Sequence, residues 1–460
     1  MKKIFALILA MVLCIGLLAA CGNGDTKDTT PAASDSGNTD TKGTTPAASS
    51  SGNNDTKGLK LGFIFLHDEN STYDLNFMNA AKEAIAALGL TEDQYLFRTN
   101  IPEGQECYNA AAELADAGCN IIFADSFGHE DYIIQAAKEF PDVQFCHATG
   151  TRAHTEGLKN FHNAFAAIYE GRYLAGVAAG LKLNEMIANG EFTADQAKMG
   201  YVGAYTYAEV VSGYTSFYLG AKSVCPSVTM EVTFTGSWYD ETAEKEGANK
   251  LIQNGCKLIS QHADSMGAPT ACETAGIPNV SYNGSTVSAC PNTFIVSSRI
   301  NWAPYYEYVV NCVLNGEEIA ADWTGTIATG SVVLTDVNEK AAAAGTADKI
   351  AEVTKALEDG SLHVFDTSTF TVEGKPVTSF MADVDTDAAY TPDTEAVKDG
   401  YIHESEYRSA PYFTLQIDGI TLLDQAYETF LPRGPNRGSW KCCKGQRSDH
   451  SPRCPLKHSI

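Results

Sequence analysis

Basic residues are scarce in this sequence, which has 32 Lys and Arg residues against 57 Asp and Glu residues and a formal net charge of −25. Seven of the basic residues fall within positions 433–460 beside a single Asp, so the preceding part is more acidic than the whole. A surface of this sign repels the phosphate backbone of nucleic acids. The charge therefore argues against DNA or RNA as a partner.

Motifs that mark the common enzyme classes are also missing. No GxSxG, HExxH, Walker or GxGxxG motif occurs in the context that its chemistry requires. His262 and Asp264 have the residue types of a base and its orienting partner, yet no nucleophile completes the set. We therefore expect no catalytic activity, and we expect no metal, nucleotide or other cofactor.

Cysteines with metal-binding spacing are absent from the central part of the chain, which has no CxxC motif. Its cysteines are Cys107, Cys119, Cys146, Cys225, Cys256, Cys272, Cys290 and Cys312. Most lie inside apolar runs such as VQFCHATG and YVVNCVLNG, so we interpret them mainly as small core residues. The sequence reveals no disulfide pairing.

The N-terminus has the layout of a secretory signal peptide. Lys2 and Lys3 precede an unbroken apolar run at positions 4–20, which ends in small residues. The sequence LAAC at positions 18–21 resembles the bacterial lipobox, which implies cleavage before Cys21 and acylation of its thiol, for example with palmitate. This predicts a lipoprotein anchored on the extracytoplasmic face of the cell membrane. The alternative is an ordinary cleaved signal peptide in which Cys21 has no role.

Residues 21–58 are expected to form a disordered tether. The unit DTKDTTPAASDSGNT, which starts at Asp25, is repeated with small changes from Asp40, and a third copy begins at Asp55. The segment has no large apolar side chain, so it cannot bury enough surface to offset the entropy of ordering. A random coil of this length reaches about 30–35 Å from the bilayer.

The end of the chain differs in composition from the rest. Residues 428–460 are expected to lie outside the fold, because the part from Arg433 onward is basic, rich in Pro, Ser and Cys, and without hydrophobic periodicity. A frameshifted or misjoined end is the favoured explanation. The alternative is a metal-binding tail, although the spacing matches no standard zinc finger. Its ligands would come from Cys442, Cys443, His450, Cys454 and His458.

Between these ends, strand and helix patterns alternate as in a doubly wound α/β protein with mainly parallel sheets. Apolar strands such as KLGFIFL and NIIFADSF are followed by helices with periodic apolar positions. The pattern restarts after a long predicted helix at residues 163–183, which indicates two similar lobes with a hinge between them. The expected divisions are lobe 1 at 59–160, the long helix and crossover at 161–197, lobe 2 at 198–300, and hinge and C-terminal segments at 301–427.

Aromatic residues stand beside carboxylates and amides in the loops after the predicted strands. Open parallel sheets bind ligands at the carboxyl ends of their strands, so we expect the site in these loops. Rings stack on the faces of a flat ligand while Asp and Asn side chains hydrogen-bond to its edge. The candidate residues are Tyr73, Asp74, Ser126, Phe127, Trp238, Asp264, Asn283 and Trp302. For each ring the alternative is ordinary core packing, and for the nearby Asp240 it is capping of the next helix.

Several segments resemble the basic membrane protein family, whose members are substrate-binding lipoproteins of ABC importers. They include NIIFADSFGHEDYIIQ, AAIYEGRYLAGVAAG, GSWYDETAEKEGANKLIQNGCKLISQHADS and NWAPYYEYVVNCVLNG. The resemblance covers about residues 59–425. It implies a two-lobed periplasmic-binding fold, a purine nucleoside or related base as the ligand, and ABC permease and ATPase subunits as partners.

The same resemblance implies roles for individual residues. It assigns Tyr73 and Asp74 to a stacking and a polar contact, Ser126 and Phe127 to the first-lobe wall, and Trp238, Asp264 and Trp302 to the second lobe. Two positions depart from the nucleoside-binding members of the family. Asn283 stands where they carry an aspartate that holds the ribose hydroxyls, and SSRINW lacks their sugar-contacting lysine.

A purine nucleoside and a free purine base, or another flat heterocycle, therefore both remain open as ligands, because an amide binds a hydroxyl less strongly than a charged acceptor does. The expected mechanism is hinged closure of the two lobes over the ligand. The alternative function is that of a surface adhesin or signalling receptor without transport.

Overall fold

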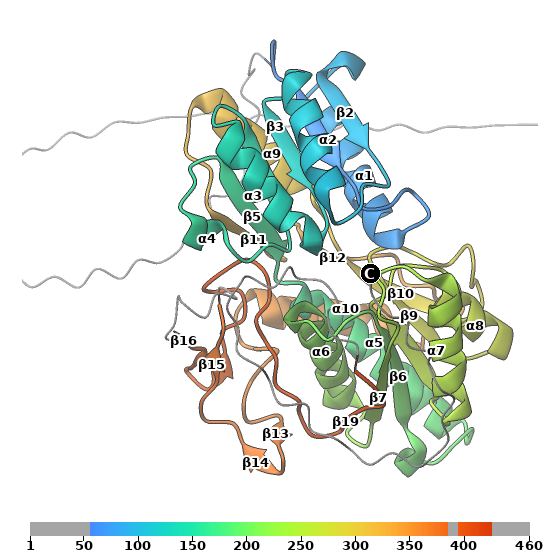
Figure 1. Cartoon of the computed structure of the whole chain (residues 1–460). Helices are drawn as coiled ribbons and strands as arrows, with labels where there is room; N and C mark the ends of the chain where they lie inside the picture. Colours follow the sequence, from blue (N-terminus) through green and yellow to red (C-terminus); the bar gives the residue numbers. More distant parts are fainter. Residues whose placement is uncertain (1–55, 385–393, 426–460) are drawn as a thin grey trace, which may run out of the picture. The chain divides into compact units, whose positions relative to one another are not determined.

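Two large sheets organise the residues that the computed structural model describes, 56–384 and 394–425 (Figure 1). All of these residues belong to the unit formed by residues 45–460. The predicted signal peptide, Cys21, nearly all of the tether and the C-terminal tail lie outside the described residues.

The first sheet is parallel throughout and has the strand order β11-β5-β4-β3-β1-β2. Its strands are β1 (Leu61–Ile64), β2 (Tyr95–Arg98), β3 (Ile121–Ala124), β4 (Gln144–Ala148), β5 (Phe161–Ala166) and β11 (Asp322–Gly325). Strands β1, β3 and β5 are buried along their whole length, as expected for strands covered on both faces. This double burial explains why β1 and β3 are short continuous apolar runs rather than alternating ones.

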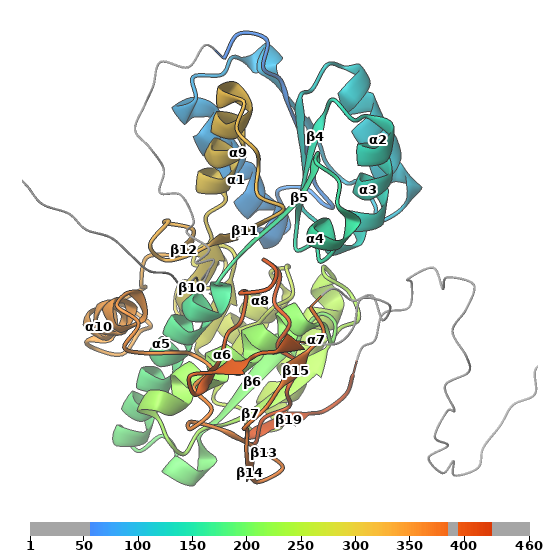
Figure 2. The ribbon, with the colours of Figure 1, turned by 90° about the vertical axis from the view of Figure 1, so that its left-hand side faces the viewer.

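Helices cover both faces of this sheet, as Figure 2 shows. They are α1 (Thr72–Ala87), α2 (Gln105–Asp116), α3 (Glu130–Glu139), α4 (Ala153–Glu156) and α9 (Ala303–Asn315), with the 3-10 turns η1 (Glu92–Gln94) and η2 (Phe127–His129). Helices α1 and α9 share a core that includes Phe77 and Tyr306, whereas α2 and α3 pack together around Leu114 and Ile133. Ser71 caps α1 by accepting a hydrogen bond from the N–H of Asp74, which fixes the start of the helix.

The second sheet has the strand order β12-β10-β9-β8-β6-β7-β19 and is parallel except for the pairing of β12 with β10. Its strands are β6 (Lys198–Gly203), β7 (Thr229–Phe234), β8 (Leu258–Gln261), β9 (Asn279–Tyr282), β10 (Phe294–Ile300), β12 (Val332–Leu334) and β19 (Ile420–Leu422). Together the two sheets confirm the predicted α/β class with mainly parallel strands.

Helices also flank the second sheet. They are α5 (Ile168–Ala188), α6 (Ala208–Val224), α7 (Glu241–Gln253), α8 (Gly267–Ala275) and α10 (Thr346–Glu358), with the 3-10 turn η3 (Ala194–Gln196). Helices α5 and α6 approach so closely that only glycine fits at two contacts. A Cβ at Gly176 would lie 2.0 Å from the carbonyl oxygen of Phe217, and one at Gly220 would lie 2.0 Å from that of Tyr173. These glycines let the two backbones pack directly against each other.

The chain passes between the two sheets three times. Strand β5 of the first sheet leads into α5, which packs in the core of the second, and β10 of the second sheet leads into α9, which packs in the core of the first. After α9, strand β11 completes the first sheet, and the chain then passes to the second sheet for the third crossing, where it forms β12.

One element differs from its prediction. The long helix expected at residues 163–183 begins only at Ile168, because residues 161–166 form strand β5. All six positions of this strand, FHNAFA, are buried. Complete burial removes the alternation that distinguishes a strand from a buried helix, so periodicity alone does not place the boundary.

The segment after α10 consists mainly of loops with short two-residue strands. These strands are β13 (Thr371–Val372), β14 (Lys375–Pro376), β15 (Met381–Ala382), β16 (Thr394–Glu395), β17 (Val397–Lys398) and β18 (Tyr401–Ile402). The segment is held by apolar side chains such as Phe365, Phe370 and Phe413, which join the core of the second sheet. It ends with β19, which extends this sheet beyond β7.

The eight central cysteines are all buried and free, which confirms their interpretation as core residues. Burial raises the pKa of the Cys119 thiol to about 11 and that of Cys146 to about 12, so these thiols stay protonated near neutral pH. Within the described ranges, no helix is both long and apolar enough to cross a bilayer.

Candidate functional site

A cavity of about 790 Å³, counted out to its mouth, is lined by loops that follow strands of both sheets. Its walls are formed by Tyr73, Ser126, Phe127, Thr149, Thr151, Tyr207, Ala208, Glu209, Trp238, His262, Asp264, Tyr282, Arg408, Ala410 and Pro411. Five of the eight residues proposed from the sequence are in this set. They are Tyr73, Ser126, Phe127, Trp238 and Asp264.

Three aromatic rings form a row along the cavity. The centroids of Phe127 and Tyr207 are 5.0 Å apart with an angle of 33° between the ring planes, and those of Tyr207 and Trp238 are 5.7 Å apart with an angle of 34°. Phe127 follows strand β3 of the first sheet, whereas Tyr207 and Trp238 follow β6 and β7 of the second. Rings from both sheets therefore meet at the cavity, where they offer stacking surfaces to a flat ligand.

Phe127 is positioned by Glu103. This carboxylate accepts hydrogen bonds from the Ser126 hydroxyl at 2.6 Å and from the Gly128 N–H at 2.9 Å, so it holds both sides of the turn that carries the ring. The Ser126 hydroxyl therefore already donates its hydrogen, and toward a ligand it can act as an acceptor.

Glu209 belongs through its carboxylate to a chain of polar contacts at the cavity wall. It lies in the first turn of α6, and its carboxylate contacts His262 Nε2 at 2.6 Å and accepts a hydrogen bond from the Tyr282 hydroxyl at 3.3 Å. His262 Nδ1 lies 3.1 Å from the Tyr201 hydroxyl, which in turn accepts from the fully buried Arg172. This chain of contacts fixes the orientation of the Glu209 carboxylate at the cavity wall.

The main chain of Asp264 connects elements that belong to different sheets. Its carbonyl oxygen accepts hydrogen bonds from the N–H and the hydroxyl of Thr72, both at 3.0 Å, and its N–H donates to the carbonyl of Trp238 at 3.0 Å. Glu244, on α7, braces the same loop by accepting from the N–H of Ser265. These bonds fix the position of the Asp264 side chain.

The Asp264 carboxyl is almost completely buried, with 4% of the residue exposed. Burial raises its pKa well above the usual range for aspartate, and the charges of Asp74, Glu244 and Glu209 raise the pKa further, whereas the amide of Asn283 opposes the rise. A donor from a ligand would favour the ionised form of this carboxyl.

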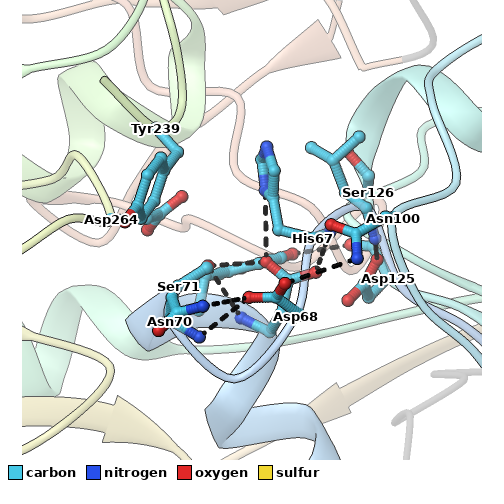
Figure 3. Close-up of polar contacts among 12 residues, drawn as sticks. His67, Asp68, Asn70, Ser71, Asn100, Asp125, Ser126, Tyr239 and Asp264 are labelled. Atoms are coloured by element: carbon cyan, nitrogen blue, oxygen red, sulfur yellow. Dashed lines mark hydrogen bonds and ion pairs between the residues drawn. The ribbon is translucent and has the colours of Figure 1, made fainter. Parts of the chain in front are cut away.

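Asp74 lies in the first turn of α1 and is not among the residues that line the cavity. It is fully buried, and it accepts hydrogen bonds from the His67 N–H at 2.8 Å and the Ser71 hydroxyl at 2.6 Å. Burial tends to raise its pKa, but the hydrogen bonds from His67 and Ser71 outweigh this and lower it. Asp74 thus anchors the loop that precedes α1, the helix that carries Tyr73. In Figure 3, Asp264 and Tyr239 face this loop from the other side.

Tyr73 donates its hydroxyl hydrogen to the carbonyl oxygen of Asp125 at 2.7 Å, which fixes its ring at the cavity. The side chain of Asp125 accepts from the N–H of Leu66 at 3.1 Å. Burial, together with the neighbouring charge of Asp74, raises the pKa of Asp125 well above the usual range. Asp125 and Asp74 are thus adjacent buried acids with pKa values shifted in opposite directions.

Trp302 and Asn283 are the other two proposed residues that the structure places outside the cavity lining. Trp302 packs in the core of the first sheet, where its ring stacks on Phe77 at 4.4 Å with an angle of 20° between the planes. Asn283 is buried, has a backbone φ of 65°, and donates its N–H to the carbonyl of Ser298 at 2.9 Å. Asp240 caps α7 by accepting from the N–H of Ala243, which confirms the capping interpretation.

Several cavity residues were not proposed as ligand contacts from the sequence. Tyr207 and Glu209 follow β6 in the same strand-to-helix position as the others, so the rule that found those residues also applied to this loop. Tyr282 is the last residue of strand β9. Arg408 lies in a C-terminal segment without periodicity, where the sequence gives no signal of proximity to the cavity.

Residues 63–362 match the family described as ABC transporter substrate-binding protein, PnrA-like. The chain is 35% identical over 261 residues to a purine-binding protein of Brucella abortus. The matched residues are 56% of this chain and 69% of that protein. It is 31% identical over 222 residues to a putative ABC transporter glucose-binding protein of Haloferax volcanii, covering 48% and 53%. An ABC transporter nucleoside-binding protein of Lactococcus lactis is 24% identical over 220 residues, covering 46% and 57%.

Solved structures show the same fold. An ABC transporter solute-binding protein of Aeropyrum pernix superposes with a TM-score of 0.57 at 16% identity, over 67% of this chain and 93% of that one. A solute-binding protein of Conexibacter woesei gives a TM-score of 0.54 at 19% identity, over 66% and 98%. These similarities confirm the predicted two-lobed periplasmic-binding fold.

Proposed function

This chain belongs to the family of PnrA-like ABC transporter substrate-binding proteins, and on that premise we propose that it captures a purine base or purine nucleoside outside the cell for import. The observation that carries the proposal is the combination, in one cavity, of a row of aromatic rings with two fixed carboxyl groups. The rings are those of Phe127, Tyr207 and Trp238, and the carboxyl groups are those of Glu209 and Asp264.

A purine matches this lining in shape and in hydrogen bonding. Its two flat faces stack on aromatic rings, and each stacked ring contributes about 1–3 kcal/mol in nucleic-acid complexes. Its ring N–H and amino groups are donors, for which ionised carboxylates are strong acceptors. Ser126 adds a hydroxyl acceptor at the same cavity.

The names of the relatives favour a purine ligand. The relative with 35% identity is named for purine binding, and another is named for nucleoside binding. The relative named for glucose binding makes a sugar the competing ligand, because sugars also pack on aromatic rings and donate hydroxyl hydrogens to carboxylates.

Capture proceeds by closure of the two lobes, without any chemical step. The cavity has walls from loops of both sheets, so a ligand that contacts Phe127 on one side and Trp238 on the other favours the arrangement in which the loops meet. The loaded form is then recognised by permease subunits whose transport is driven by an ATPase. Acylation of Cys21 keeps the binding protein at the membrane, near those subunits.

Calorimetry and thermal unfolding test this proposal. The whole chain carrying Cys21→Ser is titrated with adenine, hypoxanthine, adenosine, inosine and glucose. A ligand present at 100 times its Kd stabilises the fold by about 2.7 kcal/mol, so at least one purine is expected to raise the Tm clearly. Binding of glucose without binding of any purine would contradict the proposal. Growth on the identified purine that depends on this gene separates import from a purely sensory or adhesive role.

A further inference from the structure

The cavity has one wall that comes from outside the family-matched part of the chain. The match ends at residue 362, whereas Arg408, Ala410 and Pro411 line the cavity from the C-terminal segment. A segment outside the matched range that reaches the ligand cavity is well placed to determine which ligand is accepted.

This segment is fixed in place from both sides. Ser409 donates its N–H and its hydroxyl to the same oxygen of Asp322, on β11 of the first sheet, each at 2.8 Å. The buried Glu404 accepts the N–H groups of Tyr412 and Phe413, each at 3.2 Å. The Phe413 ring stacks on Phe365 at 4.4 Å in the core of the second sheet. The wall that it presents is therefore pre-organised rather than loose.

Arg408 is the polar feature of this wall. The residue is 4% exposed, its Nε donates to the carbonyl of Ala410 at 3.1 Å, and its Nη2 donates to that of Pro411 at 2.9 Å. Its Nη1 is buried and has no hydrogen-bond partner in the described part of the chain. The buried charge of Arg408 is offset by nearby acids, which are Glu404, Asp383, Glu130 and Asp322. Burial of the Nη1 donor without a hydrogen bond is still costly, so a ligand that accepts this hydrogen bond would gain affinity.

We infer that Nη1 of Arg408 donates a hydrogen bond to a carbonyl oxygen of the ligand, and that the cavity therefore selects oxopurines over aminopurines. This inference rests on the proposed function, whose ligand class it narrows. An oxopurine presents a carbonyl acceptor next to a ring N–H donor, so one edge of it offers partners to both a guanidinium and a carboxylate such as Asp264 or Glu209. An aminopurine would place its NH2 donor against the donor of Arg408, which is repulsive.

The test measures the ratio of two affinities. Hypoxanthine and adenine are titrated into the whole chain, and inosine and adenosine serve as the second pair in case the sugar is required. Arg408→Met keeps an unbranched apolar stem in this position but removes the guanidinium and all of its donors. Because hydrogen bonds to charged groups contribute most, we expect the variant to bind the oxopurine about 10- to 150-fold more weakly and the aminopurine with little change.

Lys398→Met is the matched control, because Lys398 is a cation of the same segment that pairs with Glu406 and does not line the cavity. It is expected to leave both affinities unchanged. Arg408→Lys keeps the charge without the forked donors, and it is expected to lose part of the preference for the oxopurine while retaining the fold. It supplies the test if Arg408→Met proves unstable in circular dichroism.

The outcomes are distinguishable. If the oxopurine-to-aminopurine ratio is the same in the wild type and in both Arg408 variants, the inference is wrong while the proposed function stands. If the wild type binds neither class of purine, the proposed function itself fails. Equal weakening of both purines together with a lower Tm would assign Arg408 a structural role only, which also overturns the inference.

Discussion

Thr72 donates both its backbone N–H and its hydroxyl to the carbonyl oxygen of Asp264, each across 3.0 Å. Thr72 begins helix α1, which packs in the core of the first sheet, and Asp264 follows strand β8 of the second. The next residue after Thr72 is Tyr73, so this double hydrogen bond joins the start of α1 to the loop after β8, and each of these contributes a cavity residue. Such a bond stabilises the arrangement in which Tyr73 and Asp264 contact the same ligand.

Thr72→Val tests whether this bond forms on closure. The substitution removes the hydroxyl bond and keeps the shape, so we expect ligand affinity to fall by roughly 2- to 12-fold, the equivalent of about 0.5–1.5 kcal/mol. The Tm of the ligand-free protein is expected to stay the same. Thr354→Val is the control, because that hydroxyl bonds only within its own helix, to the carbonyl of Ile350. A lower Tm without ligand and an unchanged affinity would show that the bond is permanent.

Two substitutions distinguish a tryptophan that lines the cavity from one that packs in the core. They are Trp238→Ala and Trp302→Ala. Trp238 lines the cavity, so its loss is expected to raise the Kd by about 5- to 150-fold, the equivalent of one stacked ring. Trp302 is 1% exposed in the core, so its loss is expected to reduce the free energy of unfolding by about 3–5 kcal/mol. Calorimetry and circular dichroism on both variants measure the two effects. Wild-type affinity in folded Trp238→Ala would remove this residue from the site.

The different positions of these two tryptophans show what a local sequence pattern does not determine. Both directly follow strands of the second sheet, and the sequence gives them the same aromatic and polar surroundings. The chain crosses to the first sheet immediately after β10, however, and this carries Trp302 to Phe77 instead of to the cavity. The direction of a crossover depends on packing between distant elements, which no local pattern encodes.

The fold was predictable because it rests on local patterns. Continuous apolar strands such as IIFA, periodic helices and capping residues such as Ser71 and Asp240 each act within a few residues. The positions of Tyr73, Phe127 and Asp264 followed from the rule that parallel sheets bind ligands near the ends of their strands. The position of Arg408 did not, because tertiary contacts such as that of Ser409 with Asp322 bring it to the cavity.

Cys21→Ser tests the predicted lipid anchor, which lies outside the described residues. Serine has no thiol for acylation, so the variant is expected to be released into the soluble extracytoplasmic fraction and to incorporate no radioactive palmitate. Cell fractionation and labelling measure both properties. Cys107→Ser, at a buried core position, is the control that keeps the anchor. Continued labelling of Cys21→Ser would contradict the lipobox interpretation.

Asp264 gives the prediction that depends on pH. Burial and the neighbouring acids Asp74, Glu244 and Glu209 raise its pKa in the folded protein well above the value in the unfolded chain. The folded state therefore holds this proton more tightly, and the free energy of unfolding falls as pH rises from the unfolded pKa toward the folded one. The side chain at position 264 cannot ionise in the variant Asp264→Asn, so the free energy of unfolding of this variant is expected to fall less over this pH range than that of the wild type.

Ligand binding couples to the same proton. If a ligand N–H donates to the ionised carboxylate, binding releases the proton, and affinity rises with pH until the raised pKa is passed. Calorimetry in buffers of different ionisation enthalpy detects the released proton directly. In Asp264→Asn we expect no proton release from this site and a loss of about 1.5–3 kcal/mol in binding free energy, because an amide replaces a charged acceptor. Affinity that falls as pH rises would show instead that the protonated carboxyl donates to an acceptor on the ligand, and Asp264→Asn, whose amide can donate in the same way, would then bind almost as tightly as the wild type.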